Sequence, residues 1–113
     1  MQGIVNNAIY QNYLEWARHE YLRQCGLDFA DLTARGIIVV VIRAEIDYCK
    51  PLRSGSQFSV SVATRRASRL KLVFEQEIRL LPDAELVASA TITTTCINPK
   101  NRPYFHPDLE ALL

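Results

Sequence analysis

The chain of 113 residues has few of the residues that mark special classes of protein, with three cysteines, two histidines and one tryptophan. Its charge is nearly balanced, because 13 basic and 12 acidic residues give a formal net charge of +1. No global field therefore draws it to nucleic acid or to an anionic membrane. The longest apolar run, Ile37 to Ile42, is too short to cross a bilayer, and no secretory leader pattern opens the chain. These absences predict a cytoplasmic protein without a nucleic-acid or membrane partner.

The three cysteines lack the spacing of a zinc site or of a disulfide framework. They are Cys25, Cys49 and Cys96, which form no C-x-x-C pair and cannot all pair within one chain. Free cysteines in a reducing compartment usually behave as small buried hydrophobic residues. We therefore expect three buried thiols and no metal.

The remaining composition is that of an ordinary globular protein, with 49% hydrophobic and 22% charged residues. A chain of this length usually forms one domain and buries roughly two-thirds of its unfolded surface. No repeat, linker or low-complexity stretch divides it. We expect residues 1–113 to form a single domain.

The first third of the chain carries a wide apolar stripe at helical spacing. The stripe consists of Tyr10, Tyr13, Leu14, Ala17 and Tyr21, widened by Ile9 and Trp16. Asn6 or Asn7 suits the N-cap, and Gly26 suits the left-handed position after the last turn. The pattern predicts a helix from about Asn7 to Cys25, wrapped by a curved sheet.

A second, short helix is predicted after Asp28, which can cap it, and before Gly36, which can end it. The apolar period then changes to two. The β-branched run from Ile37 to Ile42 is typical of a buried strand, and alternation continues to Tyr48.

Three further strands are predicted from alternating residues, over 57–65, 70–80 and 86–93. They are expected to be adjacent and antiparallel. A polar loop over 98–103 and a terminal helical turn over 107–113 follow. A helix followed by four strands predicts an α+β fold with an antiparallel sheet. Four strands are few for so apolar a helix, so the sheet is expected to lack a strand or to gain one from a partner.

The opening segment is the first candidate for chemistry. Gly3 permits close backbone approach, and N–H groups near Asn6 and Asn7 point outward from the start of a helix. Such groups can polarise a thioester carbonyl as its oxygen gains charge. A plain N-capped helix explains the same residues.

A basic corner lies between two predicted strands, at Arg65, Arg66, Ser68 and Arg69, with Lys71 just beyond. Guanidinium groups and a hydroxyl can hold a nucleotide phosphate. A solvated hairpin turn is the alternative.

Glu15 is the third candidate, because a carboxylate against an apolar wall can act as a general base. The alternative is a surface ion pair with Arg18 or with a partner residue. His19 and His106 lie in no recognisable order with a serine or cysteine nucleophile.

Several short motifs follow one another along nearly the whole chain. They are Gly3-Ile4-Val5-Asn6-Asn7-Ala8-Ile9-Tyr10, Tyr13-Leu14-Glu15, Ala17-Arg18, Cys25-Gly26-Leu27, Gly36, Tyr48 with Lys50-Pro51, and Gly55. In this order and at these spacings the chain resembles the hotdog-fold acyl-CoA thioesterases of the 4-hydroxybenzoyl-CoA thioesterase branch.

The resemblance implies a central helix wrapped by an antiparallel sheet. It implies that two chains join edge to edge, that tetramers built as dimers of dimers are common, and that the active site lies at the dimer interface. Acyl-CoA would be the substrate, with coenzyme A part of that substrate rather than a bound cofactor, and no metal is implied.

The resemblance also implies roles for particular residues. The backbone N–H near Asn7, in the loop with Gly3 and Asn6, would bind the thioester carbonyl, and Arg65, Arg66 and Arg69 would contact the phosphates. The family's aspartate, three positions before the motif glycine, would fall one residue before Met1, and its first strand would also precede this chain. Either the start is set too late, or the chain has been cut, or the protein lacks this carboxylate. The residues after Met1 are typical of a chain interior, which favours a mis-set start.

Two functions are therefore expected from the sequence. The first is hydrolysis of acyl-CoA to a free acid and coenzyme A. The second is a catalytically silent hotdog protein that binds acyl-CoA or acyl-carrier protein. A hotdog hydratase would need an Asp/His pair in another loop, which this sequence lacks.

Overall fold

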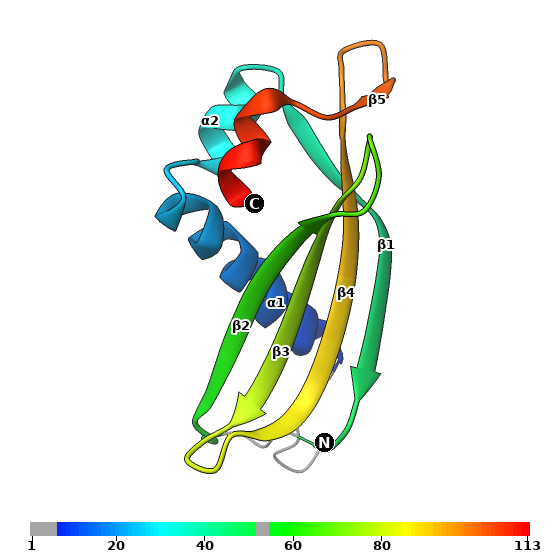
Figure 1. Cartoon of the computed structure of the whole chain (residues 1–113). Coiled ribbons are helices and arrows are strands. Elements are labelled where there is room, and N and C mark those ends of the chain that lie inside the picture. Colours follow the sequence, from blue (N-terminus) through cyan, green and yellow to red (C-terminus); the bar gives the residue numbers. More distant parts are fainter. Residues whose placement is uncertain (1–6, 52–54) are drawn as a thin grey trace.

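The computed structural model describes residues 7–51 and 55–113. Figure 1 shows a long helix, α1, crossing one face of a sheet, with the shorter helical elements gathered at one end. In chain order the elements are α1 (Asn7–Gln24), α2 (Phe29–Ala34), β1 (Ile38–Tyr48), β2 (Phe58–Arg66), β3 (Leu72–Leu80), β4 (Glu85–Ile97), β5 (Pro103–Tyr104) and the 3-10 helix η1 (Pro107–Leu112). Among the described residues, no helix is long and apolar enough to span a membrane.

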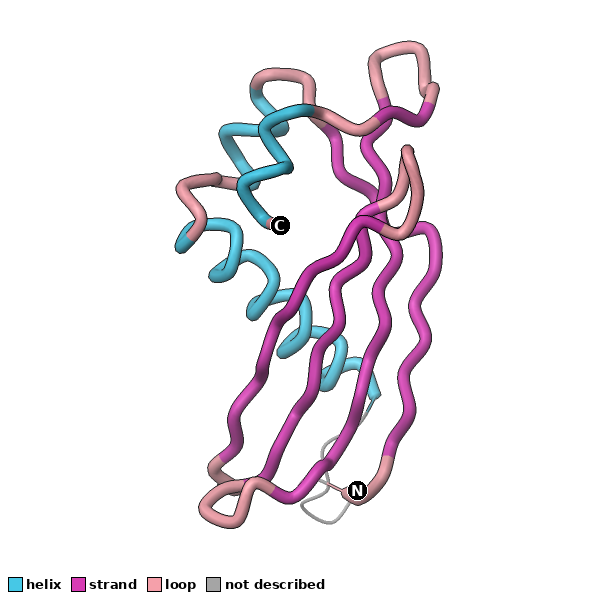
Figure 2. Tube along the Cα trace, viewed as in Figure 1, coloured by secondary structure: helices cyan, strands magenta, loops and turns pink. Residues whose placement is uncertain are grey.

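The sheet is antiparallel, with the strand order β1-β4-β3-β2. Strands β2, β3 and β4 are consecutive hairpin neighbours, as predicted, whereas β1 and β2 follow each other in sequence but lie at opposite ends of the sheet (Figure 2). The prediction of a strand ahead of the helix concerns residues before the described part of the chain and stays a prediction.

Both helix ends predicted from glycine are confirmed. After α1, Gly26 adopts a φ of +85°. Its N–H donates to the Arg23 carbonyl at 3.0 Å, and the Leu27 N–H donates to the Leu22 carbonyl at 2.9 Å. This paired pattern satisfies carbonyls that the helix leaves open and requires a left-handed residue, which favours glycine.

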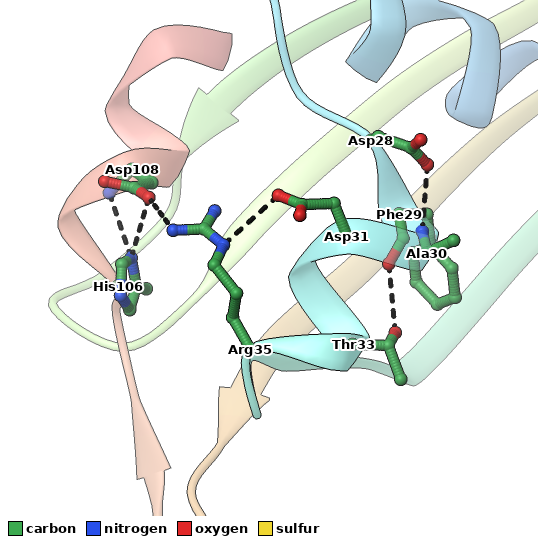
Figure 3. A network of polar contacts seen from close by, with 8 residues as sticks. All are labelled: Asp28, Phe29, Ala30, Asp31, Thr33, Arg35, His106 and Asp108. Atoms are coloured by element: carbon green, nitrogen blue, oxygen red, sulfur yellow. Dashed lines mark hydrogen bonds and ion pairs between the residues drawn. The ribbon is translucent and has the colours of Figure 1, made fainter.

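Helix α2 is joined to the C-terminal turn by a polar network (Figure 3). Asp28 caps α2 by accepting from the Ala30 N–H at 3.0 Å. Arg35 lies between Asp31 and Asp108, with N···O distances of 3.2 and 3.0 Å. The hydrogen bond to Asp108 is the main cause that raises the pKa of Arg35. The network links α2 to η1, which are far apart in sequence.

The core lies between one face of α1 and the sheet. Tyr10, Leu14 and Leu22 are buried on α1, facing an apolar cluster from β3 and β4. The wide helical stripe was only partly right, because Trp16 is 65% exposed and Ile9 is 38% exposed. Trp16 lines a hollow beside Val60 and Val62 of β2.

The prediction that residues 37–42 form a buried strand was wrong for most of that run. Ile37 is 5% exposed, but Val41 and Ile42 are 50% and 49% exposed. Strand β1 is an edge strand of the sheet and pairs only with β4 among the described strands. A strand in that position has one neighbour and little cover.

The cysteine prediction holds for Cys96, which is 1% exposed, and fails for Cys49, which is exposed. Cys25 is partly buried. Cys49 lies just beyond the end of β1. Burial raises the pKa of the Cys96 thiol, opposed by a backbone hydrogen bond from His106.

The C-terminal segment is more ordered than a simple exit loop. Pro103–Tyr104 forms β5, which pairs with the end of β4 and corrects the loop prediction for residue 103. The predicted terminal turn is confirmed as η1, which buries Leu109 and Leu112. The Tyr21 hydroxyl donates to the Leu112 carbonyl at 2.7 Å, so this turn is fastened to α1.

Candidate functional site

The predicted carbonyl-binding segment lies at the start of α1. Gly3 and Asn6 fall outside the described residues. Asn7 is the first residue of the helix, as expected. That this helix start binds a carbonyl stays a prediction.

A cleft of about 270 Å³ runs beside α1, between the helix and β1. Gln11 lines it one turn from the start of the helix. Helix α1 further contributes Leu14, Glu15 and Arg18, and β1 contributes Val41, Ala44 and Ile46. The walls combine apolar side chains with one carboxylate and one guanidinium.

Glu15 lies in this cleft with a side chain that is 59% exposed. Among the described residues, His19 Nε2 lies 4.0 Å from Glu15 Oε1, a contact that is an ion pair only when the imidazole is protonated. His19 in turn stacks on Phe29, with ring centroids 4.8 Å apart. Glu15 is therefore open to solvent and to a ligand in the cleft.

Arg18 is fixed by a side chain that the sequence reasoning missed. Its Nη1 donates to Gln76 Oε1 at 3.0 Å, and Gln76 Nε2 donates to the Leu14 carbonyl at 2.9 Å. Burial lowers the pKa of Arg18, and the charge of Glu15 opposes that shift. Gln76 is 1% exposed on β3, so it bridges the sheet and the helix within the core.

One signal in the sequence points to Gln76. Inward positions of β3 are apolar at Leu72, Phe74, Ile78 and Leu80, and Gln76 occupies the one between Phe74 and Ile78. A buried amide requires hydrogen-bond partners, so a polar residue within such a pattern indicates a specific contact.

The basic corner comprises the end of β2, with Arg65 and Arg66, and the turn that leads to β3, and these two guanidinium groups already have partners. Arg65 Nε pairs with Glu75 Oε1 at 2.9 Å. The Arg66 guanidinium lies 4.0 Å over the Phe105 ring and 3.9 Å from Glu110.

The tip of the corner is open. Arg66 also donates to the carbonyls of Ser68 and Arg69, which shapes the turn. The Ser68 hydroxyl accepts from the Leu70 N–H at 3.3 Å. The side chains of Arg69 and Lys71 are exposed.

The structure does not bring the corner and the start of α1 together within one chain. Thr64 precedes the corner and lies 3.4 Å, oxygen to oxygen, from the hydroxyl of Tyr21 in the last turns of α1. At 1.5 Å per residue, the helix rises about 21 Å between Asn7 and Tyr21. Figure 1 shows the corner at the end of the sheet away from the start of the helix.

Aromatic residues near the start of α1 pack within the structure. Tyr10 contacts Tyr48 edge to face at 5.2 Å, and Tyr13 contacts Phe58 at 4.6 Å between ring centroids. In the part of the chain that the structure describes, no group of three or more His, Cys, Asp or Glu side chains is arranged to hold a metal ion.

A family model described as the thioesterase superfamily matches residues 2–96. The chain belongs to the thioesterase superfamily. The match ends at Cys96, one residue before the end of β4, so it includes both the α1–β1 cleft and the basic corner.

Two relatives illustrate the similarity of this thioesterase-superfamily chain to proteins of known name. The acyl-acyl carrier protein thioesterase ATL2 of Arabidopsis thaliana is 34% identical over 101 residues, which cover 89% of this chain and 54% of ATL2. The long-chain acyl-CoA thioesterase FadM of Escherichia coli is 32% identical over 98 residues, covering 87% of this chain and 74% of FadM. The chain spans about half the length of the plant relatives that it matches.

The fold of this superfamily member matches that of a solved structure closely. A 1,4-dihydroxy-2-naphthoyl-CoA thioesterase from Synechocystis superposes with a TM-score of 0.91 at 22% identity, covering 97% of this chain and 83% of that one. The expected hotdog fold, an antiparallel sheet against a helix, is confirmed.

Proposed function

We propose that the chain is an acyl-CoA thioesterase, which hydrolyses the thioester of acyl-CoA to a free acid and coenzyme A. The α1–β1 cleft carries this proposal, because it begins one turn from the helix start and has an apolar β1 wall for an acyl group. Membership of the thioesterase superfamily and the likeness to FadM support it. Coenzyme A enters as part of the substrate, and no cofactor or metal is required.

In the proposed reaction the thioester carbonyl binds at the first turn of α1, near Gly3, Asn6 and Asn7. Backbone N–H groups there stabilise the oxygen as it gains negative charge. Water, or a carboxylate followed by water, attacks the carbonyl carbon, the C–S bond breaks, and the thiolate of coenzyme A leaves and takes up a proton.

Glu15 has a separate place in this proposal. The helix rises about 12 Å from Asn7 to Glu15, so the two cannot act on one carbonyl within a single chain. We assign Glu15 to the acyl-binding cleft. A carboxylate that attacks the thioester would be the aspartate that the family resemblance places one residue before Met1.

The proposal is tested by adding that residue. Two versions of the chain, with Asp or with Asn inserted immediately before Met1, are compared for thiol release from acyl-CoA across chain lengths. The Asp version is expected to exceed the Asn version by at least 100-fold, the lower range for a positioned acid–base group. Equal background rates from two folded proteins would contradict it, and coenzyme A binding without turnover would favour the silent binding protein.

We further propose that Arg65, Arg66, Ser68 and Arg69 bind the phosphates of coenzyme A. Arg69→Glu should raise the Kd for coenzyme A about tenfold, since charge-assisted contacts contribute about 1.5 kcal/mol or more. Arg66→Glu should act in the same direction. Arg102→Glu, at an exposed arginine outside the corner, is the matched control. An unchanged Kd in both corner variants would exclude the corner.

We propose a homo-oligomer, a dimer or a tetramer, with the active site at the dimer interface. Among the described strands, β1 and β2 each pair on one side only, and unpaired strand edges readily join another chain. The distance from the corner to the start of α1 is also explained if the two parts of one site come from different chains. We propose a single domain over residues 1–113 and a cytoplasmic location.

A further inference from the structure

A second, smaller cleft of about 110 Å³ continues the groove between α1 and β1. Its walls include Leu22, Phe29, Val39 and Phe74. Both clefts are lined by Glu15, Arg18 and Val41. The residues that line the two clefts run from Gln11 to Leu22 along α1 and, in the opposite sequence direction, from Ile46 to Val39 along β1. The two clefts therefore form one groove with Arg18 at the junction.

Arg18 is held at this junction from inside the core. The amide of Gln76 accepts from the guanidinium at 3.0 Å and is itself tied to the Leu14 carbonyl at 2.9 Å. Gln76 is 1% exposed, so bulk water cannot replace these hydrogen bonds of its amide. Withdrawing Arg18 would leave a buried acceptor without a partner, at a cost of about 1–3 kcal/mol.

A fixed cation at this point opposes the passage of an apolar chain. An acyl group that extends beyond the first cleft must cover the guanidinium and remove its remaining water, and burying a charge against hydrocarbon is unfavourable. The second cleft would otherwise accept the chain, because most of its lining is apolar.

Resting on the proposed function, we propose that Arg18, positioned by Gln76, is the residue that limits the length of the acyl chain this enzyme accepts. Chains that fill the first cleft are accepted, and longer chains are stopped at the guanidinium. Arg18 is thus a specificity determinant, and Gln76 is a positioning residue that acts through it.

The test uses the version of the chain with Asp inserted before Met1, called here the Asp-extended chain. Its kcat/KM is measured for acyl-CoA substrates of increasing chain length, with and without the double substitution Arg18→Met and Gln76→Leu. The double variant leaves no orphaned amide in the core, which protects the fold. For the parent, kcat/KM should rise with chain length and then level off or fall. The double variant should continue to rise beyond that length, by about threefold to fourfold for each added methylene.

Two control variants separate specificity from stability. Gln76→Glu keeps an acceptor for Arg18 and loses the donor to the Leu14 carbonyl, and it should keep the parent length limit if the contact with Arg18 sets that limit. Arg23→Met removes an exposed arginine from the same helix, paired there with Glu20, and should leave the profile unchanged.

Calorimetry measures the affinities of the same proteins for saturated fatty acids. These affinities report on binding in the groove independently of catalysis. An identical length profile in the parent and the folded double variant, in both rates and affinities, would overturn the inference and leave Arg18 and Gln76 as a structural brace. A longer affinity profile in the double variant supports the inference even when neither protein releases thiol, a result that would count against the proposed function alone.

Discussion

Cys96 and Cys49 show how differently one residue type is used in this chain. Cys96 lies within β4, 1% exposed, whereas Cys49 is exposed after the end of β1. Burial holds the Cys96 thiol in its neutral form by raising its pKa above the usual 9.0. A raised pKa in the folded state stabilises the fold fully below pH 9.0. That contribution falls above this pH, because the unfolded thiol ionises first.

These environments predict the order of thiol modification. Iodoacetamide should alkylate Cys49 in the native protein and reach Cys96 only after unfolding, because the thiolate is the nucleophile and must be accessible. Peptide mass spectrometry at pH 7, pH 8 and pH 9 measures both rates. Native modification of Cys96 at a rate similar to that of Cys49 would contradict the burial and the pKa shift.

Gln76 is a second single residue whose environment was only partly predictable from the sequence. Its position was open to prediction, because it interrupts an apolar alternation in β3, but its partners were not. Periodicity shows which face a side chain occupies and does not show which residue of another element meets it. The Arg18 contact depends on how α1 crosses the sheet, which only the assembled fold determines.

The elements themselves follow closely from local sequence signals. Helix α1 begins at Asn7, Gly26 and Gly36 end the two helices, and the three hairpin strands occur where alternation predicts them. Strand β1 was predicted as a strand but with the wrong burial, because an apolar run does not reveal whether a second layer covers it.

An irregularity in β1 explains its pattern. Pairing with β4 shifts between Val41 and Arg43, so Ile42 is an extra residue in the strand. Val39 and Val41 line the groove before the shift, and Ala44 and Ile46 line it afterwards. The sequence does not reveal this bulge, because every residue from Ile37 to Ile42 is apolar and alternation begins only at Arg43.

The C-terminal turn makes an element-scale prediction. Leu112 is 1% exposed, and its carbonyl accepts hydrogen bonds from the hydroxyls of Tyr21 and Thr64. Leu112→Ala should lower the free energy of unfolding by about 2–5 kcal/mol through the cavity that it leaves. Leu113→Ala, at a neighbour that is 55% exposed, should change it by no more than about 0.5 kcal/mol. Urea denaturation distinguishes the two, and equal effects would show that η1 is not docked.

At the scale of the whole molecule, the sheet and α1 enclose a groove that opens along β1. The sequence indicated both halves of the proposed chemistry, the start of α1 and the basic corner, but not their separation along the helix. It also did not reveal the groove, since no single motif encodes a cleft between two elements. We propose this groove as the site of thioester hydrolysis, on the basis of family membership, the fold and the apolar wall of β1.

Filling the groove tests that claim most directly. In the Asp-extended chain, thiol release from acyl-CoA is measured for Ala44→Trp, which places an indole in the first cleft. The control is Ala63→Trp, at an exposed alanine of β2 that does not line the groove. Circular dichroism confirms that both variants are folded. We predict that Ala44→Trp lowers kcat/KM at least 100-fold, because displacing a bound substrate by about 1 Å can lower the rate by about that factor. Ala63→Trp should stay within about twofold of the parent. Equal activity of the two folded variants would contradict the location of the active site in the α1–β1 groove.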